Sequence, residues 1–146
     1  MDATQSTAPI VVTHAGGLRF ASQIRTHQIV TDQSERAGGE DSAPSPLELV
    51  SAALGSCVAL YVHQFLVSRR LPHGGVRVEV TPRNASGPNR IAELSVRVCV
   101  PGELPPSTME MLERVVRSCP VHNTLSAGAS VSVAIGAMTE DHAVCG

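Results

Sequence analysis

The first third of the chain consists of short apolar segments separated by turns. Residues 9–14 and 18–24 are typical of two β-strands, and Gly16-Gly17 between them favours a tight turn, so the three segments predict a hairpin. Residues 26–31 predict a third strand. The polar segment 32–45 that follows contains glycine and proline and predicts a loop.

A complete helix start follows this loop. Ser45 is a favourable N-cap, Pro46 suits the first helical position, and Glu48 can return a hydrogen bond to Ser45 as the second half of a capping box. The pattern predicts a helix to about Arg70, where proline and glycine follow. Its apolar residues occupy nearly all faces, which predicts a helix surrounded by protein at the centre of the fold.

The second half of the chain returns to strand periodicity. Residues 76–80 and 91–100 alternate apolar and polar positions, and the turn-rich segment 82–88 joins them, so they predict a β-hairpin. With the helices on either side, the elements predict a single α+β domain over residues 1–146 with a disordered N-terminus at 1–8.

Two further helical segments are separated by a proline. Ser107 is expected to cap a helix over 109–117, which ends before Pro120. Residues 121–125 predict one more helical turn. Residues 130–135 alternate apolar and small positions and predict a final strand.

Composition and charge exclude several classes of function. The chain has 146 residues, 2% aromatic residues and a net charge of −2, so it lacks both the basic face and the aromatic platforms that nucleic-acid binding needs. Its longest uncharged apolar stretch, 49–62, spans about 21 Å as a helix, against roughly 30 Å for a bilayer core, so no membrane span is expected. No signal-peptide pattern opens the chain, which predicts a cytoplasmic protein.

Candidate chemistry centres on two of the four cysteines. Cys57 lies inside the apolar helix, where burial raises the pKa of a thiol and no helix end is near. Cys119 precedes Pro120 at a helix start, whose free N–H groups are expected to point at its sulfur and favour the thiolate. The alternative is that buried cysteines act as small hydrophobic residues. Cys99 is expected in the core, and Cys145 is expected to be incidental.

The two cysteine motifs together resemble the OsmC/Ohr family, in its OsmC-like branch. The resemblance lies in Ser45-Pro-Leu-Glu-Leu-Val-Ser-Ala-Ala-Leu-Gly-Ser-Cys57, in the preceding Gly38-Gly39, and in Cys119-Pro-Val-His-Asn-Thr-Leu125. It implies an intertwined homodimer in which antiparallel sheets wrap around long central helices, with active sites at the subunit interface.

The same resemblance implies an activity. Cys57 would be the peroxidatic thiol and Cys119 the resolving thiol in the reduction of organic hydroperoxides, through a sulfenic acid and a disulfide. A dithiol, such as a lipoylated protein or a small dithiol, would reduce the disulfide again. No cofactor or metal is implied.

In the peroxidases of this family a glutamate and an arginine hold the catalytic thiolate, and this chain departs from that pattern. The family glutamate stands ten residues before the cysteine, a position that Leu47 occupies here. Glu48, nine residues before Cys57, falls about 180° away on the helix, and its role as a capping residue is the simpler interpretation. Glu40 or Asp41 could replace the acid.

The positioning arginine is equally open. Arg19, Arg25 and Arg36 are candidates, and Arg36 stands closest to the loop that leads into the central helix. An exposed arginine that is simply solvated is the alternative for each of them.

Two other functions remain open at this point. Cys119 and His122 stand three residues apart and could bind a metal with Cys57 as third ligand, although no Cys-x-x-Cys pair supports a zinc site, and a local hydrogen bond of His122 is the simpler interpretation. A non-catalytic protein that binds a small apolar ligand at the dimer interface is the other alternative. His63, about 120° from Cys57 on the helix, is not expected to act as its base.

Overall fold

The structure is a computed structural model that describes residues 8–136. The predicted disordered N-terminus, apart from its last residue, and Cys145 lie outside the described residues. The elements in chain order are β1 (Val11–His14), β2 (Phe20–Ile24), β3 (His27–Thr31), the 3₁₀ helix η1 (Glu35–Ala37), α1 (Pro46–Ser68), β4 (Arg77–Ser86), β5 (Asn89–Cys99), α2 (Pro106–Arg117) and α3 (Pro120–Ala127). The α+β class is therefore confirmed, with two antiparallel sheets, β1-β2-β3 and β4-β5.

The long helix α1 forms as its first residues predict. The Ser45 N–H and hydroxyl donate to Glu48 Oε2 at 2.7 and 2.8 Å, and the Glu48 N–H donates to Ser45 Oγ at 3.4 Å. This confirms the capping box with Pro46 at the first helical position. The helix ends at Ser68, close to the predicted residue.

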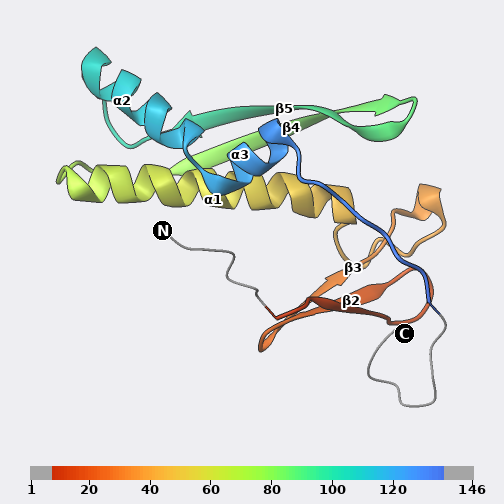
Figure 1. The fold of residues 1–146 in the computed structure, drawn as a ribbon. Coiled ribbons are helices and arrows are strands. Elements are labelled where there is room, and N and C mark those ends of the chain that lie inside the picture. The colour runs from red at the N-terminus through yellow and green to blue at the C-terminus, as the bar shows by residue number, and fades with distance from the viewer. Residues whose placement is uncertain (1–7, 137–146) are drawn as a thin grey trace.

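The core lies on one side of α1. Figure 1 shows the β4–β5 hairpin, α2 and α3 together on that side. Gly55 of α1 lets the hairpin approach closely, because a Cβ there would lie 3.1 Å from Val80 Cγ2. The buried apolar residues are Leu54, Val58, Val62, Phe65, Leu66, Leu112 and Cys119.

The other face of α1 carries apolar side chains that are exposed to solvent in the single chain. Leu47, Leu60 and Val67 are exposed, so the prediction of a helix surrounded by protein holds on one side only. α1 is long and apolar enough to cross a membrane, judged by length and composition only. The core helices of water-soluble proteins meet the same two criteria, so this is weak evidence for a membrane span. Its five buried residues pack in the core described above.

The three-stranded sheet is set apart from this core, below the N-terminal end of α1 in Figure 1. Its strands confirm the predicted hairpin and third strand, with Phe20 opposite both His14 and Thr31. Most of its apolar side chains are exposed, because little of the described chain packs against them. They are Ile10, Val11, Val12, Leu18, Phe20, Ile29 and Val30.

The segment 32–45 is more ordered than the loop expected there. Asp32 is 1% exposed and accepts hydrogen bonds from the N–H groups of Gln33, Glu40 and Ser42 and from the Ser42 hydroxyl. These bonds, those of Ser42 above all, lower the pKa of Asp32 to about 2. At Gly39 a side chain would collide with the Gln33 carbonyl, so the turn requires glycine.

The β4–β5 hairpin is longer than predicted. β4 continues through Pro82 to Ser86, with a register irregularity between Arg83 and Asn84, so the segment 82–88 is mostly strand rather than turn. Both strands of a two-stranded sheet are edge strands, and proline is tolerated on edges.

Two predictions near the C-terminus are wrong. α2 begins at Pro106 with Pro105 at the N-cap, so Ser107 does not cap it. Residues 130–135 are not a strand: within the described chain they pair with no neighbour. Val131, Val133 and Ile135 are 82, 81 and 97% exposed, because no other described segment packs against them.

Candidate functional site

The fold brings Cys57 and Cys119 together within a single chain. Cys57 is half-buried in the middle of α1, and Cys119 is completely buried at 0% exposure between α2 and α3. The two thiols are near enough for Cys119 to raise the pKa of Cys57, and neither is in a disulfide. Peroxide in solvent can therefore approach Cys57 more easily than Cys119.

The start of α3 is arranged differently from the sequence prediction. Cys119 is the N-cap and its carbonyl accepts the N–H of Asn123 at 3.0 Å, but its side chain makes no capping bond. The main-chain N–H of Val121 lowers the pKa of Cys57, the thiol that was expected to have no such group nearby. The expectation that the start of α3 serves the Cys119 sulfur is not supported, because that side chain makes no capping bond.

The electrostatic setting of Cys57 is unfavourable for a thiolate in one chain. Burial and then the bond to the Cys119 thiol raise the pKa of Cys57, while the Val121 N–H opposes them. Because the net direction is upward, most of the thiol is protonated near neutral pH. A reactive Cys57 needs a further positive charge beside it.

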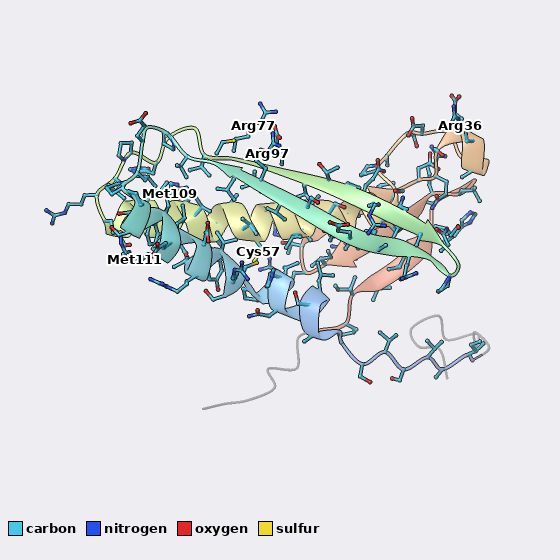
Figure 2. The ribbon with its side chains drawn as sticks, turned by 90° about the horizontal axis from the view of Figure 1, so that it is seen from above. Arg36, Cys57, Arg77, Arg97, Met109 and Met111 are labelled. Carbon is cyan, nitrogen blue, oxygen red and sulfur yellow. The ribbon has the colours of Figure 1, made fainter. Side chains whose placement is uncertain are left out.

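The candidate arginines lie in different surroundings. Arg36 is exposed on η1 and lies well apart from Cys57 in Figure 2, so the two do not meet within one chain. Arg25 occupies the β2–β3 turn with a φ of 55°. Arg19 pairs with Glu40 at 3.4 Å, which joins one candidate arginine to one candidate acid.

The predicted acid Glu48 is engaged by Ser45. The Ser45 N–H and hydroxyl lower the pKa of its carboxyl, which confirms the capping interpretation. A catalytic role for Glu48 stays a prediction that this contact does not support. Asp41 lines a separate polar cavity of about 350 Å³ beside Ser45 and Glu48.

A mostly apolar cavity of about 300 Å³ lies between α1, β5 and α3, and neither thiol is among the residues that line it. Val50 and Leu54 line it, and they stand seven and three residues before Cys57, on the same face of α1. His122, next to Val121, closes another wall. The half-buried thiol thus lies about one helical turn along α1 from a cavity with room for a compact apolar group.

The remaining sulfur and histidine candidates lie outside this site. Cys99 is exposed on the outer face of β5, opposite Arg77, so the expectation that it belongs to the core is wrong. His63 stacks edge-on against His73. His122 makes only a long 3.5 Å contact with Asn123, the local contact expected for it. Across residues 8–136, no three metal-ligating side chains gather.

Sequence reasoning missed three features of the site: the Val121 N–H, the Arg19–Glu40 pair and the cavity. Pro120 was a signal for the first, since it marks a helix start. The other two depend on segments distant in the chain.

Comparison with known proteins points to one family. The family model described as OsmC-like protein matches residues 39–134. No curated protein matches the chain.

Solved structures share the fold. A putative osmotic stress induced and detoxification response protein from Psychrobacter arcticus is 25% identical, with a TM-score of 0.75 over 83% of this chain and 90% of that one. An organic hydroperoxide resistance protein OsmC from Legionella pneumophila, also described as a predicted redox protein, is 17% identical, with a TM-score of 0.59 over 83% and 91%. An organic hydroperoxide resistance protein from Elizabethkingia anophelis is 18% identical, with a TM-score of 0.61 over 86% and 93%.

Proposed function

The chain belongs to the OsmC-like protein family, and from that premise we propose that it is a cysteine peroxidase that reduces organic hydroperoxides in oxidative stress defence. The observation that carries the proposal is the contact between Cys57 and Cys119. Family members with this fold are named for resistance to organic hydroperoxides, which supports the substrate class.

The proposed reaction uses the two thiols in sequence. The Cys57 thiolate attacks the distal oxygen of the hydroperoxide, the O–O bond breaks, and the leaving alkoxide takes a proton to become an alcohol. Cys57 is then a sulfenic acid. The Cys119 thiol attacks the Cys57 sulfur and expels water, which forms the Cys57–Cys119 disulfide. An external dithiol reduces this disulfide and is itself oxidised.

Direct contact between the thiols favours this order of events. Cys119 is fully buried, so solvent peroxide reaches Cys57 first. Because the resolving thiol already touches Cys57, the disulfide can form without unfolding of either helix. The neighbouring aliphatic cavity would hold the organic group of the hydroperoxide, and a lipoylated protein or small dithiol in the cytoplasm would be the reductant.

A homodimer is part of the proposal. Exposed large apolar side chains lie on α1, on the three-stranded sheet and at residues 131–135, and exposed apolar surface of this kind favours an interaction site. A second copy would cover them. We place the Arg19–Glu40 pair of that copy beside Cys57, where the guanidinium would supply the missing positive charge; Arg36 and Glu48 are the alternative pair.

The test is thiol titration of the reduced protein before and after one equivalent of cumene hydroperoxide, with mass spectrometry of the products. We expect loss of two thiols and a Cys57–Cys119 crosslink. Cys57→Ser should consume no peroxide, and Cys119→Ser should accumulate a sulfenic acid that dimedone traps. Cys99→Ser, which removes an exposed thiol that does not line the cavity, is the matched control and should behave as wild type. Peroxide consumption by Cys57→Ser at the wild-type rate would refute the peroxidase.

The apolar cavity favours one second candidate, a non-catalytic protein that binds a small apolar ligand. The raised pKa of Cys57 in a single chain also fits a protein without thiol chemistry. Unchanged thiols after peroxide, together with saturable binding of a compact hydrocarbon, would favour this candidate over the peroxidase.

A further inference from the structure

A pair of histidines lies near the end of α1, outside the site described above. His63 is exposed near the end of that helix, and His73 is exposed in the turn that joins α1 to β4. Their ring centroids are 5.2 Å apart, with an angle of 81° between the ring planes. His63 stands six residues after Cys57, which is about 9 Å further along the helix axis. Neither histidine lines the cavity proposed for the hydroperoxide.

The ring of His73 is held by its own backbone. Its Nδ1 lies 3.0 Å from the main-chain carbonyl oxygen of Leu71. Because a carbonyl only accepts hydrogen bonds, Nδ1 must carry the proton in this bond, and Nε2 of the neutral ring keeps its lone pair. Histidines that bind metals usually donate their other ring N–H in this way, often to a backbone carbonyl. His73 is therefore oriented as a metal-binding histidine would be, with Nε2 as the ligand atom.

The distance between the two rings fits a shared ion. Imidazole nitrogens bind zinc at about 2.0–2.1 Å, so two rings on one tetrahedral ion have centroids roughly 5 Å apart. The observed 5.2 Å agrees with this spacing. An edge-on contact between aromatic rings has a similar spacing. The bond from His73 to the Leu71 carbonyl is thus the second, independent observation that points to a metal.

The surroundings leave the other coordination positions to water. Within residues 8–136, no third histidine, cysteine, aspartate or glutamate joins the pair. The nearby cation Arg69 lies over the Phe65 ring, with its guanidinium carbon 4.0 Å from the ring centroid. Arg69 follows His63 by six residues, about 120° around the helix, so this contact holds its charge on a different side of α1.

We propose that His63 and His73 bind one divalent transition-metal ion of the zinc, nickel and copper group. Nε2 of His73 and one ring nitrogen of His63 are the protein ligands. Imidazole nitrogen suits these metals, whereas Mg²⁺ prefers oxygen ligands. The bound ion would tie the end of α1 to the turn before β4. This site involves neither thiol and does not depend on the proposed peroxidase.

The test is NMR of the ring nitrogens in reduced protein labelled with ¹⁵N-histidine, titrated with zinc chloride. Zinc should shift the ring resonances of both His63 and His73. His27, which is exposed at the start of β3, is the internal control and should not shift with them. A shift of only one ring of the pair, or of neither, would overturn the proposal. An equal effect of magnesium chloride on both rings would also overturn it.

Equilibrium dialysis of variants gives the contribution of each histidine. His63→Ala and His73→Ala should each weaken zinc binding by more than about tenfold, because even an outer-shell partner is typically worth that much. His27→Ala is the matched variant and should bind as wild type does. All proteins are compared in the same reduced state, so zinc held by thiols contributes equally to each. Wild-type affinity in either His63→Ala or His73→Ala would overturn the proposal.

Thermal unfolding supplies a second readout. Zinc bound by the folded protein alone should raise the melting temperature. The rise at saturating zinc should be larger in wild type and His27→Ala than in His63→Ala and His73→Ala. Equal rises in all four proteins would show that zinc acts elsewhere on the chain and would overturn the proposal.

Discussion

The two halves of this molecule differ in how much of their apolar surface is covered. α1 packs its Leu54–Leu66 face against the β4–β5 hairpin, α2 and α3, and both thiols lie in or beside this core. The three-stranded sheet and residues 131–135 expose apolar side chains of the same kinds. The covered part, α1 with the elements packed on it, holds the proposed nucleophile Cys57. The exposed part, the three-stranded sheet with its flanking turns, holds the Arg19–Glu40 pair. The difference is what the proposed dimer would explain, because another copy of the chain would cover the exposed apolar side chains.

The largest expected effect comes from a charge on the open side of α1. Leu60 is 51% exposed in one chain, and a second copy would bury it. Leu60→Asp should then leave an unpaired charge in the interface and produce monomers without peroxidase activity, at a cost of roughly 3 kcal/mol or more. Sedimentation velocity measures the fraction of monomers and dimers. A Leu60→Asp protein with the wild-type molecular mass would show that α1 is not the buried interface.

Core truncation sharpens the comparison between the two halves. Leu66 is completely buried, so Leu66→Ala should lower the free energy of unfolding by about 2–5 kcal/mol in urea titrations. Val131→Ala is the matched change in the exposed half and should cost less than about 0.5 kcal/mol at concentrations where the chain is monomeric. A larger cost at high concentration would place Val131 in the dimer interface.

The origin of the positive charge can be tested with two arginines. Arg19→Ala should lower kcat/KM for cumene hydroperoxide by about tenfold to a hundredfold, which corresponds to roughly 1.4–2.7 kcal/mol of a charge-assisted contact. Arg36→Ala should change it little, because Arg36 is exposed on η1 and makes no ion pair within residues 8–136. The reverse order of effects would assign the role to Arg36, the residue first expected from the sequence.

The smallest effect concerns the turn that leads into α1; it is present above about pH 4 and disappears at acid pH. The folded protein lowers the pKa of Asp32 from 3.8 to about 2, so Asp32 stabilises the fold above pH 4 and this stabilisation is lost as the pH falls from about 4 to about 2. Asp32→Asn should make the free energy of unfolding depend less on pH between about pH 2 and pH 4. The melting temperatures of wild type and variant, measured from pH 2 to pH 6, test this. The same decline of melting temperature with falling pH in both proteins would argue against the role of Asp32.

Local signals predicted the parts of the fold whose hydrogen bonds join near neighbours. The capping box needs only Ser45 and Glu48, three residues apart, and it was found where the sequence placed it. The hairpins followed from their alternation, although β4 was extended through Pro82 because an edge strand tolerates proline. The pair of cysteine motifs identified the family, which the family model confirms.

The site was predicted less completely. The sequence named both thiols, but it could not say which of them the start of α3 would face, and it placed the exposed Cys99 in the core. It also left the acid and the arginine open, because Arg19 and Glu40 belong to separate segments whose approach depends on the folded turn around Asp32.

By itself, the sequence determined the helix over residues 46–68, the antiparallel hairpins and the identity of the two sulfur atoms, since each depends on contacts within a few residues or on side-chain periodicity. Only the tertiary structure decided that Cys119 is buried, that Val121 of α3 lies near enough to Cys57 to lower its pKa, and that residues 130–135 form no strand. The physical reason is that burial, the meeting of two helices and the pairing of strands depend on residues far apart in the chain.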